Sequence, residues 1–86
     1  MTNDQIENFL NQVDFNKSKV QINFRSRNSM VGIFLKTTDF IELKSKNLWR
    51  IVNETKIDEF LSVNDESVAR IFNGVEITKL SLQKVA

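Results

Sequence analysis

The chain has 86 residues, of which 41% are hydrophobic and 27% charged, and its formal net charge is +1. This size and composition fit one small globular domain and exclude a disordered protein. The chain contains no cysteine and no histidine, which excludes disulfides, a nucleophile–imidazole pair and the usual ligands of structural zinc. We therefore predict a protein that is not an enzyme and holds no metal or cofactor, with self-association supplementing its small core.

Residues 3–13 are predicted to form the first element, an amphipathic helix. Its apolar side chains recur three and four residues apart, at Ile6, Phe9, Leu10 and Val13. Thr2 and Gln5 have the spacing of a capping box, which places the start of the helix beside Thr2. This stretch lacks the basic and apolar regions of a signal peptide, and no apolar run is long enough to span a membrane, so we expect a cytoplasmic protein.

Five β-strands are predicted to follow the helix. The first, residues 20–24, alternates apolar and polar side chains, as a strand with one buried face does. The second, residues 30–36, contains Gly32, and a glycine inside a strand indicates a bend or a close approach of backbone. The remaining three are apolar runs rich in β-formers, at residues 40–44, 47–53 and 57–63. A helical turn capped by Thr55 is the alternative for the last of them.

The tail is predicted to form a β-hairpin over residues 67–81, after a polar loop at residues 64–67. Asn73 and Gly74 lie between two β-rich runs, and Asn-Gly is the preferred pair for a two-residue type I′ turn. We therefore divide the chain into a domain of residues 1–66 and a C-terminal hairpin extension, residues 67–86, packed on the same domain.

Basic residues are concentrated in the middle of the chain. Residues 17–56 hold nine Lys and Arg against three acids, whereas both ends are acidic. This distribution fits a surface that binds a polyanion. Strands that merely carry Lys and Arg on their solvent face are the competing interpretation.

The order of elements, a short helix followed by five short strands with a glycine inside the second, resembles the Sm-like superfamily. Within it, the chain is most similar to the Hfq family of bacterial RNA chaperones. The residues that carry the resemblance are FLN at 9–11, V-x-I at 20–22, Gly32, Phe40 and Leu43. The match spans about residues 9–63 without a gap. It implies a mostly β fold, in which the N-terminal helix precedes a strongly bent five-stranded antiparallel Sm-like or SH3-like small barrel, here with the extra C-terminal hairpin.

A second register is also open. The stretch RIFNGVEITKL, residues 70–80, resembles the second Sm motif, with its glycine at Gly74. Residues 48–66 would then be an insertion. We prefer the ungapped register because the Asn-Gly turn explains Gly74 without the motif.

The resemblance implies a non-catalytic, hexameric ring that binds single-stranded RNA. Bases would stack on Phe40, with Asp39 beside it and Gln5 of the helix near a contributing position. Phosphates would be held by basic side chains, at Lys17, Lys19, Arg25 and Arg27. Strand alternation across the short turn after residue 24 predicts that Arg25 and Arg27 point to the same side.

The same resemblance places the contacts between subunits on the fourth and fifth predicted strands. The fifth strand of one subunit would pair with the fourth strand of the next. The expected interface residues are Leu48, Trp49, Ile51, Ile57 and Phe60.

A second hypothesis is an oligomeric structural or protein-interaction module that has the same small barrel and binds no RNA. The family's Lys-His pair, which grips uracil and phosphate, corresponds to Glu54 and Thr55 here, and this difference favours the second hypothesis. For Phe40 the alternative to base stacking is core packing. The adjacent acids of the chain, at Asp58, Glu59, Asp65 and Glu66, are interpreted as solvated side chains rather than metal ligands.

Overall fold

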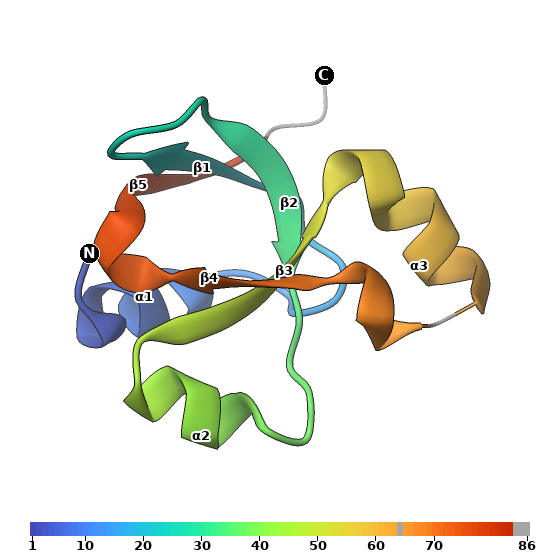
Figure 1. Ribbon diagram of the computed structural model, residues 1–86, viewed down its shortest axis with the longest axis horizontal. Coiled ribbons are helices and arrows are strands. Elements are labelled where there is room, and N and C mark those ends of the chain that lie inside the picture. Colours follow the sequence, from blue (N-terminus) through green and yellow to red (C-terminus); the bar gives the residue numbers. More distant parts are fainter. Residues whose placement is uncertain (64, 84–86) are drawn as a thin grey trace.

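A computed structural model describes residues 1–63 and 65–83 of the chain. Asn64, in the predicted loop 64–67, and residues 84–86, at the end of the predicted extension, lie outside the described residues. In the described part, helix α1 (Asn3–Leu10) precedes a five-stranded antiparallel sheet, and further helices lie between the strands (Figure 1). None of the helices within residues 1–63 and 65–83 is both long and apolar enough to cross a membrane.

The sheet has the strand order β4-β3-β2-β1-β5. Its strands are β1 (Val20–Phe24), β2 (Met30–Phe34), β3 (Leu48–Asn53), β4 (Arg70–Asn73) and β5 (Ile77–Leu82). Neighbouring strands are antiparallel throughout. No ladder among the described residues joins β4 to β5, so the sheet stays open. The predicted strongly bent barrel is therefore corrected to an open sheet that is not strongly curled.

Helix α1 begins as predicted. Thr2 Oγ1 accepts a hydrogen bond from Gln5 N at 3.2 Å, and Gln5 Oε1 accepts one from Thr2 N at 3.0 Å, which completes the capping box. Ile6 and Leu10 are buried on its inner face. The helix ends at Leu10, earlier than the predicted residue 13.

The hydrophobic core lies on both faces of the central strands, because successive side chains of a strand point to opposite faces. In β2, Phe34 belongs to one cluster and Ile33 to the other. The first cluster joins α1, β1 and β5 to β3 and contains, among others, Ile6, Leu10, Val20, Ile22, Phe34, Trp49, Ile51, Ile77 and Leu80. The second cluster lies under α3 (Ile57–Val63) and contains Ile33, Leu35, Val52, Ile57 and Phe60.

Two of the predicted strands are helices. Residues 40–44 belong to α2 (Phe40–Ser45), and residues 57–63 form α3, after the short 3-10 helix η1 (Glu54–Lys56). Ile57 and Phe60 are the two buried residues of α3, and they are three residues apart. This spacing is the period of a helix rather than that of a strand. The helical alternative for 57–63 is thus confirmed. The predicted capping residue Thr55 lies within η1, whose N-cap is Asn53, with Asn53 Oδ1 accepting from Thr55 N at 3.0 Å.

The predicted type I′ hairpin at Asn73 and Gly74 is also wrong. These residues lead into the 3-10 helix η3 (Gly74–Glu76), and no glycine has a positive φ angle. β4 pairs with β3 and β5 pairs with β1, on opposite edges of the sheet. A glycine is instead needed at position 74 because there is no room for a side chain. A Cβ there would lie 2.1 Å from Asn47 Oδ1 and 2.7 Å from Ile6 Cδ1.

The close approach predicted at Gly32 is confirmed. Gly32 pairs with Val20 on one side and with Asn53 on the other. A Cβ at this position would lie 2.7 Å from both Ile51 Cγ2 and the carbonyl oxygen of Val52. The glycine therefore lets β3 pass close to β2 at the centre of the sheet.

Candidate nucleic-acid interface

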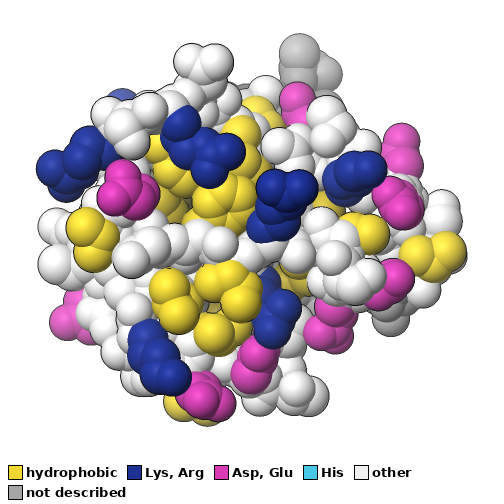
Figure 2. All heavy atoms as spheres, in the orientation of Figure 1, with side chains coloured by type: hydrophobic (Ala, Val, Ile, Leu, Met, Phe, Trp, Pro, Cys, Tyr) yellow, Lys and Arg dark blue, Asp and Glu magenta, His cyan; other side chains and the backbone are white. Residues whose placement is uncertain are grey.

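A groove of about 380 Å³ opens between the β1–β2 loop (residues 25–29), β4 and the segment that joins β3 to β4. We call it the β4 groove. Figure 2 shows this face, where Lys and Arg side chains border a hydrophobic patch between the loop and β4. The side chains that matter for its chemistry are Arg27, Met30, Lys56, Glu59, Arg70 and Phe72.

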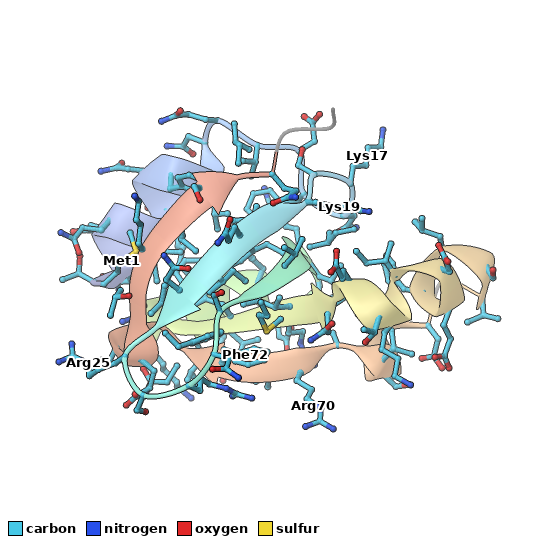
Figure 3. The ribbon with its side chains drawn as sticks, turned by 90° about the horizontal axis from the view of Figure 1, so that it is seen from above. Met1, Lys17, Lys19, Arg25, Arg70 and Phe72 are labelled. Atoms are coloured by element: carbon cyan, nitrogen blue, oxygen red, sulfur yellow. The ribbon has the colours of Figure 1, made fainter. Side chains whose placement is uncertain are left out.

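β4 contributes both a charge and an aromatic ring to the groove. Arg70 and Phe72 are two residues apart and therefore share a face of the strand, while Ile71 between them pairs with Arg50. Arg70 is exposed and Phe72 is half-buried. Figure 3 shows Arg70 projecting away from β4 and Phe72 lying between β4 and the β1–β2 loop.

Arg27 is held in place by two aromatic rings. Its guanidinium carbon lies 5.3 Å from the ring centroid of Phe24 and 5.6 Å from that of Phe72. These distances fit cation–π contacts, which leave the guanidinium N–H groups free to donate to an anion. Within the described part of the chain, neither Arg27 nor Arg70 forms an ion pair, whereas Lys56 Nζ lies 3.7 Å from Glu59 Oε2.

Arg25 lies in a different place from Arg27. It lines a broader, more open hollow of about 550 Å³, which shares no lining residue with the β4 groove. The prediction that both arginines point to the same side is therefore wrong. β1 ends at Phe24, and the chain bends through residues 25–27, so strand alternation no longer applies there. The Arg25 N–H still donates to Glu76 O at 2.8 Å.

Lys17 and Lys19 are not near the arginines of the β1–β2 loop. Both are exposed and lie at the end of the molecule opposite Arg25 (Figure 3). Neither lines the β4 groove or the hollow beside Arg25. The structure therefore does not gather the four predicted phosphate-binding residues on one surface.

Phe40, the predicted base-stacking residue, is half-buried at the start of α2. Its ring packs edge-on against Phe15, at 5.2 Å between centroids, and against Trp49, at 6.0 Å. The amino groups of Lys36 and Lys44 lie 5.6 and 5.9 Å from its ring centroid. The ring thus contributes to packing around the first core cluster, and the adjoining cavity measures only about 70 Å³.

The two polar neighbours predicted for that site have structural contacts of their own. The Asp39 carboxylate is paired with the Arg50 guanidinium, with 2.8 Å between Oδ2 and Nη2. Gln5 completes the cap of α1 and also lines the hollow beside Arg25. Asp39 and Gln5 therefore do not meet at Phe40 as one binding surface.

The residues expected at a subunit interface lie mostly inside the single chain. Trp49, Ile51, Ile57 and Phe60 are buried, and Leu48 is half-buried. β3 already pairs with β2 and β4, and residues 57–63 are a helix. The strand pairing expected between these two segments of neighbouring subunits therefore cannot form.

Of the adjacent acids, Asp65 has a local structural contact. Asp65 Oδ1 accepts from Ser67 N at 2.9 Å at the start of the 3-10 helix η2 (Glu66–Val68), and this hydrogen bond lowers the pKa of Asp65. Among residues 1–63 and 65–83, no three acidic side chains gather as ligands for one cation.

Sequence reasoning predicts only Arg27 as an RNA-binding residue among those that line the β4 groove, and it misses Met30, Lys56, Glu59, Arg70 and Phe72. The spacing of Arg70 and Phe72 was the available signal, since a basic and an aromatic residue at i and i+2 share one face of a strand.

Comparison with known proteins gives no match to a protein-family model, to a curated protein or to a solved structure. The resemblance to the Sm-like superfamily thus rests on residue pattern and element order.

Proposed function

We propose that the chain binds single-stranded RNA without catalysis and that the β4 groove is its binding surface. The observation that carries this proposal is the placement of Arg27, Lys56 and Arg70 around the half-buried ring of Phe72. Basic side chains supply the phosphate contacts in nucleic-acid recognition, and aromatic rings and guanidinium planes stack on unpaired bases. The groove offers both kinds of contact side by side.

The charges of the groove support the same proposal. Glu59 is the one acid among the described residues that line the groove, and Glu59 is paired with Lys56. The positive charges of Arg27 and Arg70 are therefore left to attract a polyanion. Their contacts are expected to make binding weaken as salt is raised, because each phosphate that is neutralised releases counterions.

The element order is compatible with a Sm-like arrangement, which we include in the proposal. α1 precedes the sheet, whose order is β4-β3-β2-β1-β5, and Gly74 lies in the turn between β4 and β5. The place of Gly74 favours the second register. That register counts residues 48–66 as an insertion, whereas β3 occupies residues 48–53 and the segment between β3 and β4 is residues 54–69. Self-association into a ring would have to use the outer edges of β4 and β5, which pair with nothing further in the described residues.

A protein-interaction module is the second candidate function. Helix α3 extends from the body of the molecule (Figure 1), and its Leu61 and Val63 side chains are 62% and 63% exposed. Each of these side chains offers an apolar contact that a partner protein could cover. Native mass spectrometry distinguishes a monomer from an assembly of copies.

Fluorescence anisotropy with labelled U-rich and A-rich RNA, measured across a salt series, tests the RNA-binding proposal. We expect Arg27→Ala/Arg70→Ala to weaken binding and to reduce the slope of log K against log salt by about 1.4, for two lost contacts to a single strand. Lys17→Ala/Lys19→Ala removes the same charge at the other end of the molecule and should leave binding nearly unchanged. Absence of binding at low salt, or equal losses in both variants, would overturn the proposal.

A further inference from the structure

We propose that the RNA strand continues from the β4 groove across the β1–β2 loop into the hollow that Arg25 lines, which we call the Arg25 hollow. The inference rests on the proposed function and specifies its ligand. The protein would take a strand of several nucleotides that occupies both depressions, rather than a single nucleotide. Two features carry it, namely the position of the loop between the depressions and the matching chemistry of the two surfaces.

The β1–β2 loop gives one arginine to each depression. Arg25 lines the Arg25 hollow and Arg27 lines the β4 groove. The two residues are separated by only one other, so their Cα atoms are at most about 7 Å apart. A strand that contacts Arg27 therefore needs to advance only a short distance to reach Arg25. Figure 3 shows Arg25 at the outer end of the same loop that Phe72 lies beside.

The opposite wall is also shared. β4 continues directly into η3, and Phe72 from β4 lines the groove while Val75 from η3 lines the hollow. The loop is fixed to this wall by the hydrogen bond from Arg25 N to Glu76 O, at 2.8 Å. The two depressions therefore adjoin at these two segments, while the remaining lining of the Arg25 hollow comes from residues 1–5 and 45–47.

The Arg25 hollow has the chemistry that a nucleic-acid strand requires. Its described lining residues include Arg25 and Lys46 and no acid. Lys46 Nζ lies 3.6 Å from Glu42 Oε1, and the N-terminal amino group of Met1, which also lines the hollow, donates to Gly74 O and Ile77 O. Among these described cations, Arg25 is the one whose charged group forms no ion pair or hydrogen bond within the described part of the chain. Val75 is 53% exposed and offers an apolar contact next to that charge. The hollow thus repeats the combination of arginine and apolar surface that marks the β4 groove.

A series of fluorescein-labelled oligouridylates tests the inference by its dependence on length. Oligomers of about two, four, eight and twelve nucleotides span the usual site sizes of proteins that bind single strands. We expect affinity to rise with length until both depressions are filled and then to level off. Arg25→Ala should weaken binding of the longer oligomers by about tenfold, the loss of one charge-assisted contact, and leave the shortest unchanged.

Matched variants separate the possible failures. Arg27→Ala/Arg70→Ala should weaken binding at every length, and Lys19→Ala should weaken it at none. Equal affinity at all lengths, or an Arg25→Ala effect that is absent or independent of length, would overturn the continuous path while leaving the β4 groove as a site. Failure of every oligomer to bind the unaltered protein would overturn the proposed function as well. Arg25 is exposed and its backbone hydrogen bond survives the substitution, so unchanged thermal unfolding of Arg25→Ala is the fold control.

Discussion

Arg50 and Asp39 form a two-point ion pair that ties β3 to the turn before α2. Arg50 Nη2 donates to Asp39 Oδ2 at 2.8 Å, and Arg50 Nε donates to Oδ1 at 3.3 Å. Thr37 Oγ1 donates to the same Oδ1. The hydrogen bonds from Arg50 and then from Thr37 lower the pKa of the Asp39 carboxyl from its ordinary 3.8 to about 2.

This pair predicts part of the acid sensitivity of the fold. A carboxyl whose pKa is lower in the folded than in the unfolded chain adds stability above the unfolded pKa of 3.8, and that contribution is lost as the pH falls toward about 2. Asp39→Asn should therefore lower the free energy of unfolding at neutral pH and flatten its decline below pH 3.8. Urea unfolding followed by fluorescence of Trp49 measures both effects. Asp58→Asn, at an exposed acid, is the control, and an unchanged acid profile in Asp39→Asn would contradict the prediction.

The close approach at Gly32 limits the size of the side chain that can be placed at the centre of the sheet. Gly32→Val places a Cβ 2.7 Å from the Val52 carbonyl oxygen, which belongs to the backbone and cannot move without disturbing β3. We expect a loss of about 1–3 kcal/mol or more in the free energy of unfolding, measured by chemical denaturation. Gln21→Val adds the same side chain at an exposed position of β1 and should cost little. Equal stability of the two variants would refute the close approach.

We predict that substitutions at Gly74 and Asn47 have coupled effects on the free energy of unfolding. A Cβ at Gly74 would lie 2.1 Å from Asn47 Oδ1, which accepts from Trp49 Nε1 at 2.9 Å. Gly74→Ala should therefore displace Asn47, break that hydrogen bond and lower stability by about 1–3 kcal/mol. Asn47 has a φ of 58°, so Asn47→Gly is tolerated by the backbone and removes the obstructing side chain. In a double-mutant cycle, Gly74→Ala should cost less in the Asn47→Gly background, and a coupling of zero would contradict this account.

The C-terminal strands predict that residues 67–86 are needed for folding. β5 pairs with β1, and its Ile77 and Leu80 are buried in the first core cluster. A chain that ends at residue 66 loses both strands, which expose the edge of β1 and that side of the core. We expect no cooperative thermal unfolding and no near-UV circular dichroism of Trp49. A cooperative transition in the shortened chain would show that residues 1–66 fold alone.

Local patterns predicted the parts of the fold that depend on local interactions. The capping box at Thr2 and the alternation along residues 20–24 were both readable, because each is decided by neighbours within a few residues. Residues 40–44 and 57–63 were misassigned because their apolar, β-forming residues outweighed the helical spacing of Ile57 and Phe60. The turn at Gly74 was misassigned because the requirement there is space beside Asn47, which depends on packing between segments far apart in the chain.

The candidate site was less predictable than the fold. Arg27 is predicted from its place on a short turn as a phosphate contact, and it lines the β4 groove. Its partners Phe24 and Phe72 come from strands that meet only in three dimensions. Lys56 and Arg70 are separated in the sequence, and the segment between β3 and β4, which contains α3, brings them to one groove. Residues predicted by resemblance, such as Phe40, are used for packing because residues 40–44 form a helix instead of a strand.

NMR titration of the isotope-labelled protein with an unlabelled U-rich oligomer tests the central claim most directly, because it locates the ligand without any substitution. We expect amide chemical shifts to change around Arg27, Lys56 and residues 70–72, and these changes to fade as salt is raised. Changes confined to α3 or to the region of Lys17 and Lys19, or no changes at low salt, would contradict RNA binding in the β4 groove.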